Sequence, residues 1–202
     1  MAEKRNVILV TDGDTVARRA VEQAVNNIGG RCISRSAGNP TPISGSEIID
    51  LIKTAKHDPV VVMVDDKGSS HTGKGETALF EIVKHPDIDI LGVIAVASNT
   101  QGVNGIKVDF SITCDGKIIQ EAVNKDGYPQ KSQILYGDTV DIIDQCKVPL
   151  VVGIGDIGKM YGKDDCEIGA PIITKAMEEI LVRSGFTHEN EKKTGGKHKH
   201  TK

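Results

Sequence analysis

The sequence predicts an α/β fold: a single Rossmann-like or flavodoxin-like three-layer domain with a mainly parallel sheet. Continuous apolar runs, typical of strands buried on both faces, alternate along the chain with helical patterns that carry one apolar face. The connections between them are short, so we expect successive strands to run parallel through right-handed crossovers. We place the domain at residues 4–185, with a small β-hairpin insertion, and expect a disordered basic tail at residues 186–202.

The first half of the chain repeats one unit, a strand followed by a turn and a helix. Apolar residues 7–10 predict the first strand, and residues 16–28 predict a helix that stops at two glycines. RCISRS at 31–36 predicts a short second strand, and Ser44 and Glu47 form a capping-box pair that opens the second helix. PVVVMV at 59–64 and IDILGVIAVAS at 88–98 are the third and fourth strands, and Pro86 ends the helix between them.

The second half departs from this repeat. IKVDFSIT at 106–113 and KIIQEAV at 117–123 flank Asp115-Gly116, a hairpin signal, and predict a small antiparallel insertion or edge extension. A helix is expected at 138–146 and a strand at 148–155. After a long loop, Pro171 suits the first turn of a last helix.

The composition argues against several classes of protein. No segment approaches the roughly 20 apolar residues of a membrane span, and the first residues lack the apolar core of a signal peptide. We therefore expect a cytoplasmic or peripheral protein with no transmembrane segment of its own. The four cysteines are scattered without a C-x-x-C pair, which predicts neither a zinc cage nor a disulfide framework.

The charge balance argues against a nucleic-acid partner. The whole chain carries a net charge of −3, and the tail from Gly185 holds five lysines against two glutamates, a local charge of +3. The rest of the chain therefore carries −6, and it contains no Trp on which bases would stack. No cofactor is expected.

Polar residues follow each predicted strand. In a parallel sheet these strand ends share one edge, where ligands of such folds bind. We expect a ligand or partner site at this edge, although loops are polar in any case. The candidate residues are Asp12, Asp14, Asn39, Asp65, Asp66, Lys67, His71, Gly73, Lys74, Asn99, Gly153, Gly155 and Asp156.

One candidate motif is a phosphate-binding loop. GSSHTGKG at 68–75 matches G-x-x-x-x-G-K, but Gly75 stands where Ser or Thr would coordinate magnesium. Its glycine amides at a helix start, with Lys74, could still hold an anion. The other interpretation is a surface loop with a cationic tip.

A second candidate is a magnesium-dependent phosphoryl-handling site. Asp12 and Asp14 follow the first strand as the nucleophile and acid of haloacid-dehalogenase-like phosphatases do, and Asp65 and Asp66 could complete a metal site. The metal candidates are thus Asp12, Asp14 and Asp65. Against this, the helix begins almost at once and leaves no room for that family's flap. The simpler interpretation is an aspartate cap on the first helix.

Two further motifs are weaker. GIGDIG at 153–158 reads as G-x-G-x-x-G, but the next helix begins much later and no strand follows it. There is no G-x-S-x-G elbow, and His71 has no nucleophile beside it, so nucleophilic hydrolysis is not favoured. The loop after 153 is long enough to be functional or mobile.

Taken together, several stretches resemble one family. The chain is similar to the stage V sporulation protein AE family of spore-forming Bacillota, over roughly residues 5–185. The stretches that carry the resemblance are VILVTDGD at 7–14, SAGNPTPISG at 36–45, VMVDDKGSSHTGKGE at 62–76, GIGDIGKM at 153–160 and GAPIITKAMEEIL at 169–181.

The resemblance implies a non-enzymatic role in the machinery that moves dipicolinic acid, usually with calcium, into the developing spore and out during germination. The implied partners are other subunits of that complex, both membrane-embedded and soluble, with this chain peripheral at the spore inner membrane. How many copies assemble is open. The family supplies no catalytic residues to carry over.

This role gives the strand-end loops two alternative uses. Lys67, Lys74 and glycine amides could hold the dipicolinate dianion, while Asp65 and Asp66 could hold calcium. Alternatively, the glycine-rich loops form a docking surface for another subunit. The remaining alternative is the phosphoryl-handling enzyme or a simple nucleotide or anion binder.

Overall fold

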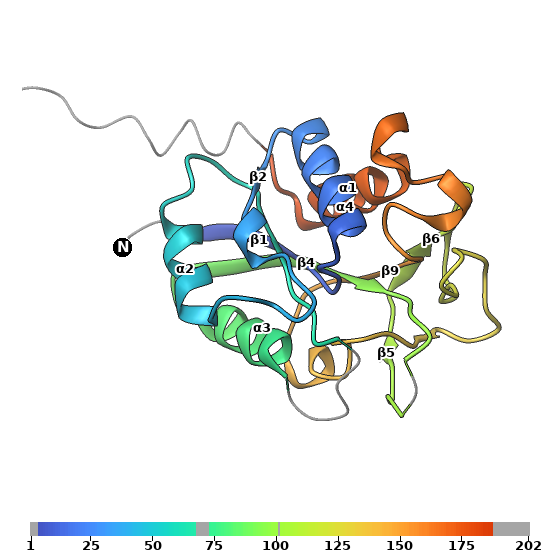
Figure 1. Cartoon of the computed structure of the whole chain (residues 1–202), viewed down its shortest axis with the longest axis horizontal. Coiled ribbons are helices and arrows are strands. Elements are labelled where there is room, and N and C mark those ends of the chain that lie inside the picture. Colours follow the sequence, from blue (N-terminus) through green and yellow to red (C-terminus); the bar gives the residue numbers. More distant parts are fainter. Residues whose placement is uncertain (1–3, 68–72, 101, 188–202) are drawn as a thin grey trace, which may run out of the picture.

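A mixed α/β fold is present in the computed structural model, which describes residues 4–67, 73–100 and 102–187. Within these residues the main sheet has the strand order β2-β3-β1-β4-β9-β6-β7, and it is parallel except for the β6–β7 pair (Figure 1). Its strands are β1 (Arg5–Val10), β2 (Arg31–Cys32), β3 (Val60–Met63), β4 (Ile88–Val96), β6 (Phe110–Ile112), β7 (Ile118–Ile119) and β9 (Val151–Ile154). A separate antiparallel pair joins β5 (Ile106–Lys107) to β8 (Ile134–Leu135).

Helices cover both faces of the main sheet, as predicted. They are α1 (Thr15–Asn27), α2 (Gly45–Lys53), α3 (Lys74–Lys84) and α4 (Pro171–Ser184). In β1, Val7 and Leu9 pack into the core beneath α2 and α3, whereas Ile8 and Val10 pack into the core beneath α1 and α4. Both sets are fully buried, because side chains alternate between the faces of a strand. This explains why the strand reads as a continuous apolar run.

The crossovers place a crevice at the ends of the central strands. From β1, helix α1 leads to β2 at one side of the sheet, whereas α3 leads from β3 across β1 to β4 on the other side. Because α1 and α3 lie on opposite faces, the loops that leave β1 and β3 diverge. Such a topological switch point is where doubly wound sheets bind ligands.

The predicted starts of α2 and α4 are confirmed. At α2, the Ser44 hydroxyl accepts the amide of Glu47 and the Glu47 carboxylate accepts the amide of Ser44, a complete capping box. Pro171 occupies the first turn of α4, as predicted.

The long loop before α4 is tied to the fold by a buried carboxylate. Asp164 is fully buried and accepts amide hydrogen bonds from Ile172 and Ile173 at the start of α4, at 2.8 and 3.0 Å, and from Gly158 at 3.1 Å. Short 3₁₀ turns at Met160–Gly162 and Cys166–Ile168 fill the space between these anchors.

Several predicted elements differ from the structure. The strand expected at 106–113 is divided into β5 and β6, which belong to different sheets. The helix expected at 138–146 is wrong: only the 3₁₀ turn Ile143–Gln145 is helical there, because Thr139 takes a left-handed φ of 59° that interrupts a helix. The apolar residues of this segment are buried nonetheless. The second strand is shorter than predicted, because Ser34–Ser36 turns and the Ser36 hydroxyl accepts the amide of Met63.

The hairpin is confirmed as an edge extension. Ser111 pairs with Ile119 and Ile112 with Ile118 around the predicted turn, while β6 pairs in parallel with β9. Of the disordered tail expected at 186–202, Phe186 is described and packs against the core beneath α1 and α4. The tail from residue 188 and the glycine loop at 68–72 lie outside the described residues.

We predict that Asp164→Ala lowers the free energy of unfolding by about 2–3 kcal/mol, because it leaves three amides without their acceptor. Ser44→Ala, at the exposed cap of α2, should cost only about 1 kcal/mol. Urea denaturation followed by circular dichroism measures both variants. Equal losses would contradict the role assigned to Asp164.

Candidate functional site

A cavity of about 290 Å³ lies at the carboxyl ends of β1, β3, β4 and β9, at the switch point of the sheet. The prediction placed the candidate residues at this edge, and several of them are brought together here. The residues that line the cavity are Thr11, Asp12, Asp14, Asn39, Asp65, Lys67, Val96, Ala97, Ser98, Thr100, Lys125, Asp138, Asp156 and Lys159.

Close backbone approaches shape the cavity wall. A Cβ atom at Gly13 would lie 2.5 Å from the carbonyl oxygen of Gly38, so glycine lets the loop after β1 touch the loop that carries Asn39. The Thr11 hydroxyl accepts the amide of Val96 at 3.0 Å and joins the ends of β1 and β4. A larger residue at Gly13 would therefore force apart the two loops that bound the cavity.

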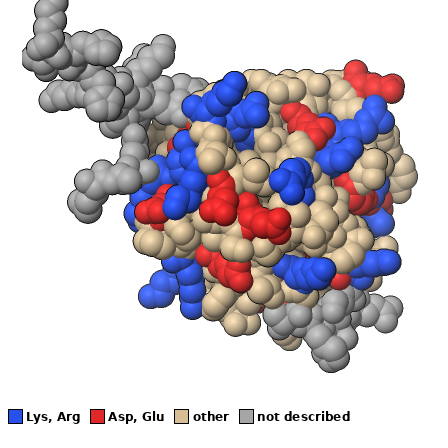
Figure 2. Space-filling model, turned by 60° about the vertical axis from the view of Figure 1, so that its left-hand side comes forward, with Lys and Arg blue, Asp and Glu red and all other residues tan. Residues whose placement is uncertain are grey.

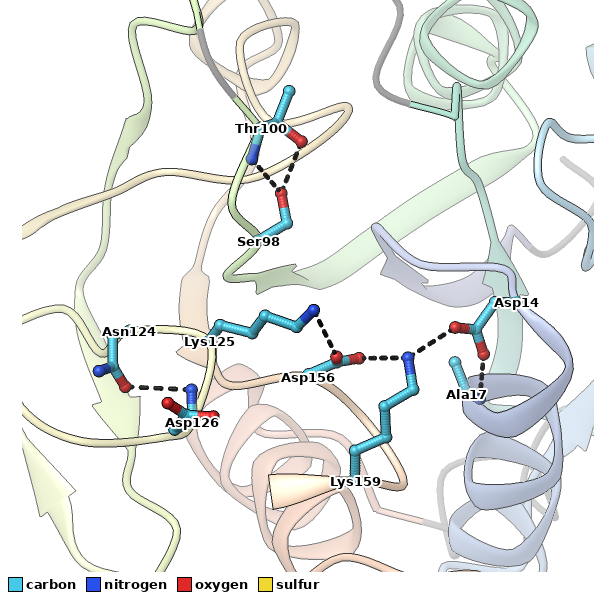
Figure 3. A network of polar contacts seen from close by, with 9 residues as sticks. All are labelled: Asp14, Ala17, Ser98, Thr100, Asn124, Lys125, Asp126, Asp156 and Lys159. Atoms are coloured by element: carbon cyan, nitrogen blue, oxygen red, sulfur yellow. Dashed lines mark hydrogen bonds and ion pairs between the residues drawn. The ribbon is translucent and has the colours of Figure 1, made fainter. Parts of the chain in front are cut away.

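Four charged side chains that line the cavity form a chain of ion pairs (Figure 3). Lys159 Nζ lies 2.8 Å from Asp14 Oδ2 and 2.9 Å from Asp156 Oδ1, and Lys125 Nζ lies 3.4 Å from Asp156 Oδ2. Asp156 is the most buried of the four, with its side chain 11% exposed. We call Asp14, Lys159, Asp156 and Lys125 the ion-pair network. It ties the start of α1 to the loop after β9 and to the segment at 124–127.

Two helix amides and Lys159 bind the Asp14 carboxylate. Its Oδ1 accepts the amides of Val16 and Ala17, both at 2.8 Å, and so caps α1. Partial burial favours the neutral acid, but Lys159 and these amides outweigh it and hold the pKa of Asp14 below its usual range. The simpler interpretation of this residue, a helix cap, is confirmed.

Asp12 and Asp65 differ from the ion-pair network. Burial raises the pKa of Asp12 to about 7 even though the Asp14 amide binds its Oδ1, and the negative charges of Asp14, Asp65 and Asp156 add to the rise. Burial likewise raises the pKa of Asp65 to about 6, helped by the charge of Asp138, although the Lys67 amide binds Asp65 Oδ1 at 3.0 Å. Carboxyls that titrate near neutrality in a cleft are typical of ligand-binding sites.

The phosphate-loop candidates lie elsewhere. Gly73 and Lys74 line a separate groove of about 450 Å³ with the start of α2. At the start of α3, Asp66 Oδ1 accepts the amide of Gly75 at 2.6 Å and Oδ2 that of Glu76 at 2.8 Å. A Cβ atom at Gly73 would overlap the Asp66 carboxylate. The chain's own carboxylate thus occupies the amides that a phosphate would use.

The other candidates have different surroundings. Asn99 is exposed and is not part of the cavity lining, which takes Ser98 and Thr100 instead. Gly153 and Gly155 admit close neighbours: a Cβ atom would overlap the Ser111 hydroxyl at the first and lie 2.7 Å from the Gly127 amide at the second. His71 lies outside the described residues.

Sequence reasoning missed Lys125, Asp138 and Lys159. Lys159 stands three residues after Asp156 and forms an ion pair with it. This spacing was the one local signal that could have pointed to Lys159. Lys125 comes from a loop on the far side of the hairpin, so nothing in its sequence neighbourhood points to the cavity.

The part of the chain that the structure describes contains no preformed set of ligands for the predicted metal ion. No three or more His, Cys, Asp or Glu side chains are arranged there to hold an ion. Asp12, Asp14 and Asp65 all line the cavity, but Asp14 is committed to α1 and Lys159.

The face shown in Figure 2 carries both signs of charge. Lys and Arg side chains are interspersed there with Asp and Glu. Because neighbouring charges of opposite sign offset each other, the electrostatic field of this face extends only a short distance.

A family model decides the relationship that the sequence suggested. The model described as Stage V sporulation protein AE1 matches residues 6–184. The chain belongs to this family. No curated protein and no solved structure matches it. In this member of the family, none of the helices in the described residues is long and apolar enough to cross a membrane.

We predict that Lys159→Met lowers the free energy of unfolding by about 1–3 kcal/mol. The substitution leaves two carboxylates facing each other, and partial exposure of Lys159 limits the loss. Lys131→Met, an exposed position outside the network, is the matched control. Chemical denaturation near neutral pH measures both, and equal stability of the two variants would show that the network contributes nothing.

We predict that Asp12→Asn stabilises the protein increasingly as the pH rises. The pKa of Asp12 is about 7 in the folded chain and about 4 in an unfolded one. Folding therefore takes up a proton between these values, and stability from this group falls as the pH rises from about 4 to about 7. The variant should exceed the natural chain by about 2–4 kcal/mol near pH 8 and by almost nothing near pH 4.

Urea denaturation across this pH range tests the prediction. Asp50→Asn, at an exposed position of α2, is the control for the same chemical change and should show no such trend. A pH-independent difference between Asp12→Asn and the natural chain would disprove the raised pKa.

Proposed function

We propose that this chain is a non-enzymatic, peripheral component of the machinery that moves dipicolinic acid into the developing spore and out during germination. The observation that carries the proposal is membership of the Stage V sporulation protein AE1 family over residues 6–184. The chain works from the cytoplasm or the surface of the spore inner membrane, in contact with the membrane-embedded and soluble subunits of the same complex.

The geometry favours this role over a phosphoryl-handling enzyme. Asp14, the acid of that alternative, is bound by two helix amides and by Lys159. The amides of Gly75 and Glu76, which an anion at α3 would need, already bind Asp66. Both contacts stabilise the fold and leave these groups poorly placed for phosphoryl transfer.

The geometry also favours docking over direct transport of the dianion. The groups that the sequence suggested for dipicolinate and calcium are divided: Lys67 and Asp65 line the strand-end cavity, Lys74 lines the groove beside α2, and Asp66 caps α3. Among the described residues, neither the cavity nor the groove is lined by all of these groups. We therefore propose that the loops contact other subunits, which hold the cargo.

We predict that the chain restores dipicolinic acid accumulation and release in a spore-forming bacterium whose own family member has been deleted. Terbium fluorescence measures the dipicolinic acid content of the spores and its release on germination. The same chain, carrying an affinity tag, should sediment with membranes that contain the other subunits and not with membranes that lack them.

Two outcomes would contradict this proposal. Normal dipicolinic acid content and release in the deletion strain would exclude the role. Magnesium-dependent phosphatase turnover by the purified chain, abolished by Asp12→Asn, would assign it to the enzyme class instead.

A further inference from the structure

The charges that line the strand-end cavity do not balance. Five carboxyls and three lysines line it among the described residues. The ion-pair network contains two of each, so it is internally neutral. The lining carboxyls outside the network include Asp12 and Asp65, whereas the lining lysine outside it is the exposed Lys67. The lining charges outside the network therefore sum to an acidic excess.

Asp12 has unused hydrogen-bonding capacity. Among the described residues, its side chain accepts one hydrogen bond, from the Asp14 amide to Oδ1 at 3.1 Å. Its Oδ2 remains available to a molecule in the cavity. Three neighbouring carboxylates, Asp14, Asp65 and Asp156, all act on it with like charge. A carboxylate in such a position is costly to the fold unless a cation joins it.

We propose that the strand-end cavity is a binding site for a small organic cation, an ammonium or guanidinium compound, whose N–H groups bind Asp12 and Asp65. The site goes beyond the docking role and does not depend on it, because it requires no other subunit.

The lining and the volume favour this class of ligand. Ser98, Thr100 and Asn39 add neutral oxygens that accept N–H groups beside the two carboxyls. The volume of about 290 Å³ lies just below the roughly 300–1,000 Å³ of sites for drug-sized ligands, which suits a small metabolite rather than a peptide. Guanidinium and ammonium groups supply several N–H donors, and a guanidinium group can bind a carboxylate through two of them.

Binding of a cation is coupled to protons. Asp12 and Asp65, with pKa values of about 7 and about 6, must be ionised to hold the ligand. The affinity should therefore rise with pH, and ligand binding should release protons into the buffer. A group that titrates near 7 implies a gain of more than about tenfold between pH 5.5 and pH 8.

Isothermal titration calorimetry of the full chain with agmatine and putrescine tests this inference at constant ionic strength. We expect binding at about pH 8 that weakens at least tenfold at about pH 5.5. Asp12→Asn should lose at least tenfold in affinity at the higher pH and lose most of the pH dependence, because the amide cannot ionise. Asp50→Asn should behave as the natural chain does. Tetramethylammonium, which has the charge but no N–H donor, should not bind.

Other results would overturn the inference. They are no binding of either amine by the folded chain at pH 8, unchanged affinity in Asp12→Asn, or tight binding of Ca²⁺, Mg²⁺ or dipicolinate that agmatine does not displace. The folding of Asp12→Asn is checked by its circular dichroism spectrum. Because the titration uses the isolated chain, its failure would leave the dipicolinic acid role standing, and failure of that role would leave the titration unaffected.

Discussion

Burial of the central strands on both faces is the constraint on which the other features depend. Val7, Ile8, Leu9 and Val10 have no exposed surface, and residues of β3 and β4 flank them. A strand of this kind has no place for a charge along its length, so the first polar residues appear where it ends. Because β1, β3, β4 and β9 run parallel, these ends coincide. The concentration of Asp and Lys at one edge is thus a consequence of the sheet as well as a feature of the site.

Local sequence signals predicted the elements that local energetics control. Apolar runs located β1, β3 and β4, and the capping box and Pro171 located the starts of α2 and α4. The segment at 138–146 failed for a tertiary reason: its apolar spacing suits a helix, but Thr139 turns left-handed and its hydroxyl binds Asp66 from another loop. Lys125 reaches the cavity from a sequence-distant loop. Side-chain direction also escaped prediction, because Asn99 is exposed between two residues that line the cavity.

At the same edge of the sheet, the carboxylates of the ion-pair network are neutralised by lysines, whereas the carboxyl of Asp12 is not. Lys159 sits within 3 Å of two carboxylates, which gains Coulomb energy without adding net charge to the cavity. Among the described residues Asp12 receives no such partner, and its pKa rises instead. A fold selected for stability alone would gain from neutralising Asp12, since its ionisation opposes folding at neutral pH. Residues that oppose folding in a cleft are more often explained by binding than by structure.

The contrast between Asp66 and Asp12 makes the same argument in geometric terms. Asp66 is buried, but it accepts two helix amides and the Thr139 hydroxyl, so the fold itself supplies its hydrogen-bond donors. In doing so it fills the anion position at α3 and turns a sequence that resembles a phosphate loop into a structural cap. Asp12 lies at a strand end with one amide donor and an open oxygen. The carboxylate of Asp66 therefore has its hydrogen-bond donors within the chain. The carboxylate of Asp12 needs a donor from outside it.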